Sequence, residues 1–381
     1  MQPDLAFFIP SFRGGGAETA VIRLANWFGS HGLKVDLIIL AAEGPLSPDV
    51  DASVHVVNFH VGRAARALFP LRKYLAENQP QVFVSNMAHL NVLSVLARSW
   101  MSCNTRLFLI EHSDVQAWRA YEGSLKEGCI LRFMRWTYPR ADIVAAVSRG
   151  SAESLASVLK QPKSFVETMP NSVDVTALRS AAAEQPSHAW LRNGREAPVF
   201  VAMGRLVPVK GFLDLLDAFA LFRGKWPARL ILIGEGPQRG ELERRISVLG
   251  LDDCVDLPGF VKNPLPFVAR ADAFLLSSHT EGQGIVLLEA MAVGTPIVAT
   301  DCPSGPRELL DGGKAGLLVP VDDPAAMAEA MHIVLHDAAL RAGLREAGLR
   351  QVQRYDIKQV AVRFMDLSRR AGFTIRVDDN A

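Results

Sequence analysis

The sequence predicts an α/β protein made of two doubly wound, parallel-sheet domains. Short apolar runs alternate with amphipathic segments along almost the whole chain, which is typical of parallel strands joined by helices. The pattern restarts after a polar stretch at 180–197. The chain has 381 residues, more than one hydrophobic core usually supports, so two domains are expected.

Six apolar runs in the first half predict buried strands. They lie at 5–9, 35–40, 54–59, 81–85, 106–111 and 142–148. The segment between the first two predicts a helix, because its apolar residues recur at the spacing of one helical face. These residues are Ala20, Val21, Leu24, Ala25 and Phe28. Helices of this kind are expected on both faces of the sheet.

The second half repeats the pattern with six further runs. They lie at 197–204, 229–234, 254–259, 272–277, 295–300 and 316–320. We expect a first domain of residues 1–175, joined by a C-terminal helix at 357–375, and a second domain of residues 176–356.

Composition narrows the class of protein. Apolar residues make up 49% and charged residues 21%, which is typical of globular proteins. The net charge of +1 argues against nucleic acid as a partner. Four scattered cysteines without a C-x-x-C pair, no signal-peptide pattern and no run of roughly 20 apolar residues favour a cytoplasmic protein.

The most informative segment is 272–301, DAFLLSSHTEGQGIVLLEAMAVGTPIVATD. It predicts a strand, a glycine-rich loop, a helix and a second strand, with Glu281 and Glu289 near the junction of loop and helix. Backbone N–H groups at 284–287 would lie at the helix start, where the dipole favours anions. Carboxylates can hold hydroxyl groups while amides hold phosphates, and a sugar nucleotide offers both.

A second strand-to-helix turn carries two cations. The run 198–203 leads into GRLVPVKG, in which Arg205 and Lys210 flank the turn. A guanidinium can form two hydrogen bonds to a phosphate, and an ammonium supplies a point charge. The alternative, a solvated basic turn, is disfavoured because the same strand–turn–helix position recurs at Glu281.

The first half offers two candidate sites at strand ends. Gly14, Gly15 and Gly16 follow the first strand and open a helix, where glycines let the backbone approach a ligand closely. Their spacing is not that of the dinucleotide-binding fingerprint. His112 follows the strand 106–111, at the edge where open α/β sheets bind ligands.

Metal and acyl-transfer chemistry receive no support. Residues 312–315, GGKA, lack the upstream glycine and the hydroxyl of a phosphate-binding loop, and no G-x-S-x-G elbow is present. We therefore expect no metal site.

The second-half motifs, in their order and spacing, resemble the retaining, two-Rossmann-domain (GT-B) glycosyltransferases of family 4. The motifs are GRLVPVKG, LIGEGP, EGQGIVLLE and GTPIVAT, and the resemblance covers nearly the whole chain. It implies an NDP-sugar donor bound in an interdomain cleft, with the acceptor bound mainly by the first domain. The nucleotide sugar would be a substrate, and no cofactor is expected.

The resemblance implies roles for the matching residues. Arg205 and Lys210 would bind the donor diphosphate. Glu289 would hold the ribose, and Glu281 the hydroxyls of the transferred sugar. Backbone amides after the first glutamate would assist; these belong to Gly282, Gln283, Gly284, Ile285 and Val286.

From the other domain, Gly14, Gly15 and Gly16 would approach the diphosphate, and His112 would lie beside the reacting sugar. The expected catalytic group is His112, Glu281, Arg205 and Lys210. One departure concerns Gln283, because the family often has an aromatic residue there.

The expected reaction is metal-independent hexosyl transfer with retention, to a sugar or lipid-linked sugar acceptor of polysaccharide biosynthesis. A UDP-linked hexose or N-acetylhexosamine is the first candidate donor and GDP-mannose the second. The alternatives are a nucleotide-sugar epimerase of the same architecture, a phosphorylase and a sugar-nucleotide binding module. Product formation without acceptor would indicate the epimerase, and tight UDP or GDP binding would exclude the phosphorylase.

Two basic segments bear on membrane contact. Arginines alternate with apolar residues near 63–73 and in 131–140, LRFMRWTYPR. Basic amphipathic helices can lie on anionic membranes at the inner face, but ordinary surface helices have the same pattern. The sequence leaves both interpretations open.

Overall fold

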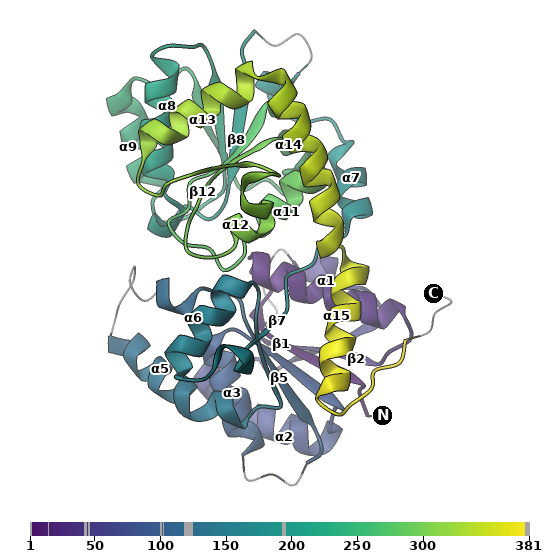
Figure 1. The fold of residues 1–381 in the computed structure, drawn as a ribbon. Helices are drawn as coiled ribbons and strands as arrows, with labels where there is room; N and C mark the ends of the chain where they lie inside the picture. Colours follow the sequence, from purple (N-terminus) through teal and green to yellow (C-terminus); the bar gives the residue numbers. More distant parts are fainter. Residues whose placement is uncertain are drawn as a thin grey trace. The chain divides into compact units, whose positions relative to one another are not determined.

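The chain forms two compact α/β units in a computed structural model (Figure 1). The first unit comprises residues 1–173 and 356–381, and the second comprises residues 174–355. The structure describes residues 2–13, 15–41, 44, 46–99, 101, 103–117, 125–192 and 196–377. Each unit contains a wholly parallel sheet with helices packed on it, which confirms the predicted fold class.

The first unit is built on a seven-stranded sheet. The strand order is β3-β2-β1-β4-β5-β6-β7. The strands are β1 (Leu5–Ser11), β2 (Val35–Ala41), β3 (Val54–Asn58), β4 (Val82–Asn86), β5 (Arg106–Glu111), β6 (Ile143–Ala146) and β7 (Glu167–Thr168). The direction of winding reverses between β1 and β4, so the carboxyl ends of these two strands flank a crevice of the kind that binds ligands in open α/β sheets.

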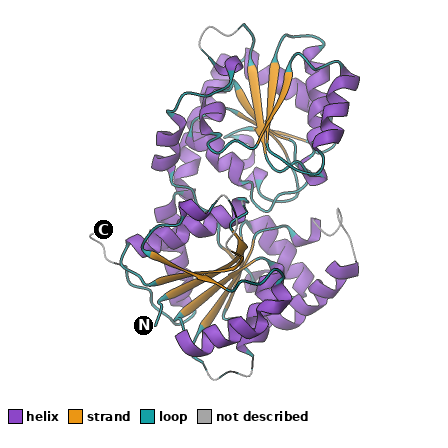
Figure 2. Cartoon of the chain, turned by 180° about the vertical axis from the view of Figure 1, so that it is seen from behind, coloured by secondary structure: helices purple, strands orange, loops and turns teal. Residues whose placement is uncertain are grey.

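Helices cover both faces of this sheet (Figure 2). They are α1 (Gly16–Ser30), α2 (Leu68–Asn78), α3 (Ala88–Arg98), α5 (Leu125–Thr137), α6 (Arg149–Leu159) and α15 (Ile357–Arg370). Side chains of β1 alternate between two cores. Phe7 packs in the core that includes α1 and α15, whereas Phe8 packs in the core that includes α2, α3, α5 and α6. Because successive side chains enter apolar cores on opposite faces of the sheet, the strand is apolar at every position.

The helix α15 completes the first unit from the far end of the chain. Its residues Val360, Phe364 and Leu367 are buried in the same core as α1. The ring of Phe364 stacks on Phe108 of β5 with 5.0 Å between centroids and 5° between planes. The core of the first unit therefore depends on a segment that follows the whole second unit in sequence.

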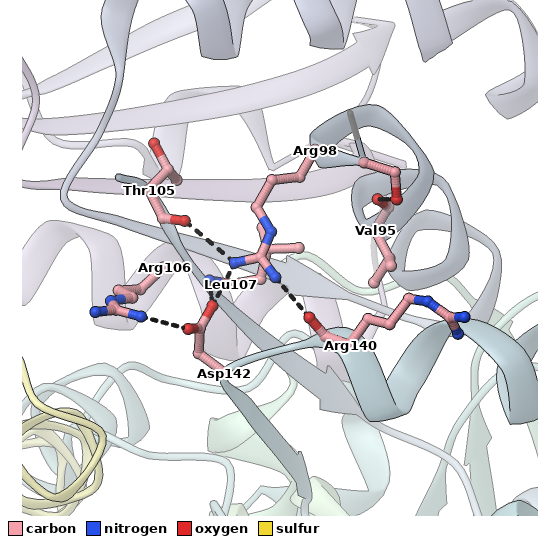
Figure 3. A network of polar contacts seen from close by, with 8 residues as sticks. Val95, Arg98, Thr105, Arg106, Leu107, Arg140 and Asp142 are labelled. Atoms are coloured by element: carbon pink, nitrogen blue, oxygen red, sulfur yellow. Dashed lines mark hydrogen bonds and ion pairs between the residues drawn. The ribbon is translucent and has the colours of Figure 1, made fainter. Parts of the chain in front are cut away.

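A polar network closes the amino-terminal edge of the same sheet, opposite the carboxyl ends (Figure 3). The Asp142 carboxylate forms ion pairs with Arg98 and Arg106, and it accepts a hydrogen bond of 2.9 Å from the backbone N–H of Leu107. Burial opposes ionisation of Asp142, but these donors outweigh it and lower its pKa. The network joins the end of α3 to the starts of β5 and β6.

The second unit contains a six-stranded sheet in the order β10-β9-β8-β11-β12-β13. The strands are β8 (Val199–Met203), β9 (Arg229–Ile233), β10 (Val255–Gly259), β11 (Ala273–Leu276), β12 (Ile297–Thr300) and β13 (Leu317–Val319). Here the winding reverses between β8 and β11. The strands that precede the two predicted donor-binding loops are therefore neighbours at the switch point.

The helices of the second unit pack around this sheet. They are α7 (Val175–Ala182), α8 (Phe212–Arg223), α9 (Arg239–Leu249), α10 (Leu265–Arg270), α11 (Ile285–Ala292), α12 (Pro306–Leu309), α13 (Pro324–His336) and α14 (Ala338–Gln351). One core joins α8, α9 and α13 to alternate residues of β8 and β9. The helices α7, α10 and α11 contact one another.

All twelve predicted strands are present, with ends that differ from the predicted ones by at most two residues. The sequence did not predict β7, because its two residues, Glu167 and Thr168, form no apolar run. Within the described part of the chain, no helix combines the length and apolar character needed to cross a membrane.

Candidate functional site

The predicted donor-binding residues of the second unit lie at the carboxyl ends of β8 and β11. The loop after β8 spans 204–211 and contains a single 3₁₀ turn, Pro208–Lys210. The loop after β11 spans 277–284 and leads into α11. Because β8 and β11 are adjacent and parallel, both loops meet at the same edge of the sheet.

Lys210 and Glu281 form an ion pair at this edge. The distance between Nζ and Oε1 is 2.6 Å, and the side chains are 26% and 9% exposed. Ser278 Oγ also donates to Glu281 Oε1 at 2.7 Å. A carboxylate this buried requires compensating partners, and it has a cation and a hydroxyl. The pair concentrates both signs of charge where a ligand with phosphates and hydroxyls would be bound.

Hydrogen bonds hold the two loops against each other. Ser277 Oγ donates to Lys210 O at 2.9 Å, and the backbone N–H of His279 donates to Val209 O at 2.9 Å. On the other side, Thr300 Oγ1 at the end of β12 donates to the carbonyl of the same loop at 2.6 Å. The position of Lys210 relative to Glu281 is therefore set by neighbouring backbone.

Arg205 follows β8 directly and is exposed. Within the part of the chain that the structure describes, its guanidinium has no ion-pair partner. The turn that carries it is fixed, because the backbone N–H of Leu206 donates to Glu235 O at 2.8 Å and that of Gln238 donates to Leu206 O at 3.1 Å. Arg205 thus combines a fixed backbone with a side chain that can contact an anion.

The helix α11 begins at Ile285, after Gly284 in the left-handed region. The first-turn N–H groups of this eight-residue helix lie next to the Glu281 loop, as predicted. Gln283, in the position where the family often has an aromatic residue, is buried. Its carbonyl packs against Gly305, where a Cβ would come within 2.4 Å of Gln283 O. Glu289 is half-buried in the second turn of α11, eight residues after Glu281.

A thiol that the sequence did not single out lies in the same place. Cys302 follows β12 and is buried. Burial, and then the negative charge of Glu281, raise the pKa of the Cys302 thiol well above its usual range. The Cys302 side chain is therefore an uncharged thiol next to Glu281 and is not a nucleophile at neutral pH.

In the first unit, His112 lies at the carboxyl end of β5 and contacts two asparagine amides. Its Nε2 is 2.9 Å from Asn86 Oδ1, and its Nδ1 is 3.1 Å from Asn171 Oδ1. Burial lowers the pKa of His112 to about 4, although part of the side chain remains accessible. The ring is neutral at physiological pH and carries one N–H.

Asn86 presents an amide oxygen to the ring. Its Nδ2 donates to Phe8 O at 3.2 Å, which directs Oδ1 toward His112. Asn171 presents its Oδ1 to Nδ1, and because an amide oxygen only accepts, the single N–H of the neutral ring donates to one of these two oxygens. Both ring nitrogens are engaged inside the first unit, so the arrangement favours a contact role for His112 over proton transfer.

Glu111, the residue before this histidine, is the last residue of β5 and is buried. Burial raises the pKa of Glu111 to about 7, against the opposing effect of hydrogen bonds from the Tyr138 hydroxyl and from backbone N–H groups, including that of Ala88. These bonds tie the end of β5 to the start of α3.

The glycine loop after β1 is described in part. Gly14 lies outside the described residues. Gly15 has extended backbone and precedes α1, and Gly16 is the first residue of that helix. They lie at the β1 side of the switch point of the first unit, next to the β4 end that carries Asn86.

Comparison with known proteins identifies the family. A model described as Glycosyltransferase Family 4 matches residues 14–177, and one described as Glycosyl transferases group 1 matches residues 197–337. The N-acetylgalactosamine-N,N'-diacetylbacillosaminyl-diphospho-undecaprenol 4-alpha-N-acetylgalactosaminyltransferase of Campylobacter jejuni is 30% identical over 372 residues, which are 94% of this chain and 97% of that enzyme. The chain belongs to glycosyltransferase family 4.

Two further similarities agree with this family 4 assignment. The lipopolysaccharide core biosynthesis glycosyltransferase LpsE of Rhizobium meliloti is 28% identical over 341 residues, covering 88% of this chain and 90% of LpsE. The structure of HepE from Anabaena, in complex with UDP and glucose, has a TM-score of 0.79 at 20% identity and covers 96% of this chain and 99% of HepE. The latter similarity shows the GT-B fold. The family assignment does not support the epimerase alternative.

Some residues of the site in this family 4 glycosyltransferase were not predicted. Ser278 and Cys302 interact with Glu281, although neither was among the predicted site residues. Asn86 and Asn171 contact His112 across 26 and 59 residues of chain. Asn86 ends a strand at the switch point, and that position is the one signal that could have identified it.

One group of side chains has the composition of a metal site. Asp214, His279 and Asp322 each place a ligand atom within 4.8 Å of the others. His279 Nε2 lies 2.5 Å from Asp214 Oδ2, the distance of a hydrogen bond. The contact is thus explained by the protein's own groups.

Proposed function

We propose that this glycosyltransferase moves a sugar from an NDP-sugar to a hydroxyl of a lipid-linked or polysaccharide-precursor acceptor. A UDP-linked hexose or N-acetylhexosamine is the first candidate donor, and GDP-mannose is the second. The relative from C. jejuni is named for transfer to a diphospho-undecaprenol-linked sugar, and LpsE for lipopolysaccharide core biosynthesis. HepE, which shares the fold, was solved with UDP and glucose.

The observation that carries this proposal is the Lys210–Glu281 pair at the β8–β11 switch point. The donor diphosphate would lie between Arg205, Lys210 and the first-turn amides of α11. Glu281 would hold hydroxyls of the transferred sugar, with the amides of 282–286 beside it, and Glu289 would hold the ribose. Cations, amides and carboxylates then each face the part of the donor with complementary chemistry.

The reaction needs stabilisation of the leaving group. Breaking the glycosidic bond leaves negative charge on the diphosphate, which Arg205, Lys210 and the helix amides would neutralise without a metal. The acceptor hydroxyl would attack from the face that the diphosphate leaves, with its proton passing to a phosphate oxygen. This route predicts retention at the anomeric carbon, and an inverted product linkage in an NMR assay would exclude it.

The first unit would contribute contacts to the donor sugar. His112 would shape the sugar pocket through its ring, since both nitrogens already have partners. Gly14, Gly15 and Gly16 would bring backbone close to the diphosphate. His112→Gln is then expected to weaken transfer less than removal of a diphosphate ligand.

The test is removal of each member of the pair. Lys210→Ala and Glu281→Gln are each expected to lower acceptor-dependent release of UDP from a UDP-sugar by at least about 100-fold, since one preorganised electrostatic group contributes on the order of 10²–10³ in rate. Lys210→Ala should also weaken UDP binding in calorimetry. Lys314→Ala is the matched control, because that exposed lysine pairs with Asp311 far from the motif loops in sequence.

Wild-type turnover in Lys210→Ala or Glu281→Gln would remove that residue from the site. Failure of the wild-type protein to bind either UDP or GDP would contradict the proposed donor class. Sugar product formed equally well without acceptor would contradict transfer.

We also propose peripheral contact with an anionic membrane through α5, which would place the enzyme at the inner face of the membrane. Phe133 and Trp136 are 50% and 43% exposed on this helix, and Arg140 lies over the Trp136 ring at 4.4 Å. Phe69, at the start of α2, is 78% exposed. Exposed aromatic side chains among arginines are typical of helices that lie in a lipid interface.

Co-sedimentation with vesicles tests this contact. The wild-type chain should sediment with phosphatidylglycerol vesicles at low salt, and Phe133→Ser with Trp136→Ser should lose most of that binding. Val248→Ser is the control, because Val248 is 76% exposed on the second unit. Equal sedimentation with neutral vesicles, or no sedimentation, would favour an ordinary surface helix.

A further inference from the structure

A cluster of three side chains lies beside the turn that carries Lys210. It consists of Asp214, His279 and Asp322, here called the brace. His279 Nε2 is 2.5 Å from Asp214 Oδ2 and 3.3 Å from Asp322 Oδ1. Asp214 lies in the first turn of α8, His279 in the loop after β11 and Asp322 in the loop between β13 and α13. One imidazole thus joins three segments of the second unit.

The imidazole of the brace packs against the turn that carries Lys210. Gly211, the next residue, has φ +61°, and a Cβ there would lie 2.1 Å from Ser277 O and 3.0 Å from His279 Nε2. The backbone N–H of His279 also donates to the carbonyl of Val209. The histidine ring therefore occupies the space directly beside the Lys210 turn, while its backbone lies two residues before Glu281.

The contact with Asp214 is the stronger part of the brace. The imidazole is 18% exposed and Asp214 is 36% exposed, whereas Asp322 is 75% exposed. An exposed carboxylate at 3.3 Å contributes little because solvent screens it. Asp214 is also the first acidic residue of the helix that starts at Phe212, so its backbone position is fixed by the same turn.

We propose that Asp214 and His279 are positioning residues for the donor site. They hold the Lys210 turn and the Glu281 loop at the separation that lets both head groups contact one diphosphate sugar, and they do not themselves contact it. This inference rests on the proposed function of Lys210 and Glu281. It assigns a role to two residues that the donor motif does not contain.

UDP affinity measured by calorimetry tests the role, with GDP as the probe if UDP does not bind. His279→Ala and Asp214→Ala should each weaken binding by about tenfold, the size of coupling expected between contacting residues. His279→Gln keeps an N–H near the position of Nε2, and Asp214→Asn keeps the acceptor oxygen. Both conservative variants should remain within about threefold of wild type.

A matched control lies on the same helix. Asp217 is an ion-paired aspartate of α8, but its partner is Arg245 of α9, away from both loops. Asp217→Ala should leave UDP affinity unchanged. A loss equal to that of Asp214→Ala would mean that any weakened pair on α8 has the same effect, and it would overturn the inference.

A double-mutant cycle separates positioning from general damage to the fold. If His279 acts through Lys210, His279→Ala should change UDP affinity by less than about twofold in a Lys210→Ala background. Full additivity would overturn the inference while leaving the proposed function intact. Unchanged UDP affinity in Lys210→Ala alone would instead overturn the proposed function, and this inference with it.

Chelation distinguishes a hydrogen-bonded brace from a cation site, since aspartate and imidazole can also bind divalent metals. UDP affinity should be the same in EDTA and in millimolar Mg²⁺ or Mn²⁺. The role assigned here would be overturned if EDTA weakened UDP binding to the wild type but had no effect on UDP binding to Asp214→Asn.

Discussion

At the scale of single residues, the end of β5 places two neighbours with opposite titration behaviour side by side. Burial lowers the pKa of His112 to about 4 and raises that of Glu111 to about 7. In the unfolded chain the same groups titrate near 6.5 and 4.5. Each shift makes stability depend on pH, and the two dependences have opposite signs.

For His112, the unfolded chain binds the extra proton between pH 6.5 and 4, so folding free energy is lost as pH falls through that range. For Glu111, the folded chain binds the extra proton between pH 4.5 and 7, so stability is lost as pH rises through that range. Where the ranges overlap, from about pH 4.5 to 6.5, the two contributions nearly cancel, because each has a slope of about 1.4 kcal/mol per pH unit.

Substituting either His112 or Glu111 should reveal the pH dependence that the remaining residue gives to the free energy of unfolding. In His112→Gln, urea unfolding should show stability that falls as pH rises from 5 to 6, by about 1.4 kcal/mol relative to wild type over that unit. Glu111→Gln should show the opposite slope. Parallel pH profiles for wild type and both variants would contradict the assignment of buried, uncharged forms to these two residues.

At the scale of elements, we expect α15 to contribute strongly to the stability of the first unit. Phe364 is fully buried and contacts Phe7, Phe28 and Phe108. Phe364→Ala should lower the free energy of unfolding of the first unit by about 3–5 kcal/mol, the usual cost of removing a buried aromatic ring.

Val362 provides the control for this change. It lies on the same helix but is 49% exposed, so Val362→Ala should change stability by less than about 0.5 kcal/mol. Urea unfolding followed by circular dichroism compares the two variants. A small effect of Phe364→Ala would mean that the core closes without α15.

The elements also show how far the sequence can be interpreted. Runs such as 5–9 and 229–234 predicted β1 and β9 because a strand buried on both faces is apolar at every position. The two-residue β7 has no such signal. The turn at 204–211 and the loop at 277–284 were predicted, since glycines and charges cluster there.

Strand order could not be predicted from the sequence. The pairing of β8 with β11 joins residues about 70 positions apart, and it brings the loop of Lys210 next to the loop of Glu281. The Asp214–His279 contact depends on the same pairing, whereas the contact of His112 with Asn86 depends on the pairing of β4 with β5 in the first unit. Local pattern therefore predicted which loops carry the site, and tertiary structure determined what supports it.

At the scale of the whole molecule, the two units differ in continuity. The second unit is one uninterrupted segment, 174–355, with its own core and with Lys210 and Glu281. We predict that this segment, expressed alone, unfolds cooperatively and binds UDP, because the proposed diphosphate ligands of both loops lie within it.

The first unit should behave differently. Residues 1–173 lack α15, so a large part of one core would be exposed. This segment should be aggregated or partly unfolded when produced alone. A cooperative transition for 1–173, or none for 174–355, would contradict the division of stability between the units.

Because α15 packs in the first unit but follows the second unit in sequence, the first unit is completed last during synthesis. Ribosomes release domains from the amino terminus onward, at about 5–20 residues per second. Roughly 200 residues separate β7 from Phe364, so the sheet face that α1 and α15 cover emerges without α15 for on the order of 10–40 s. The second unit can fold in that interval. During it the incomplete first unit exposes apolar core residues, to which chaperones would bind.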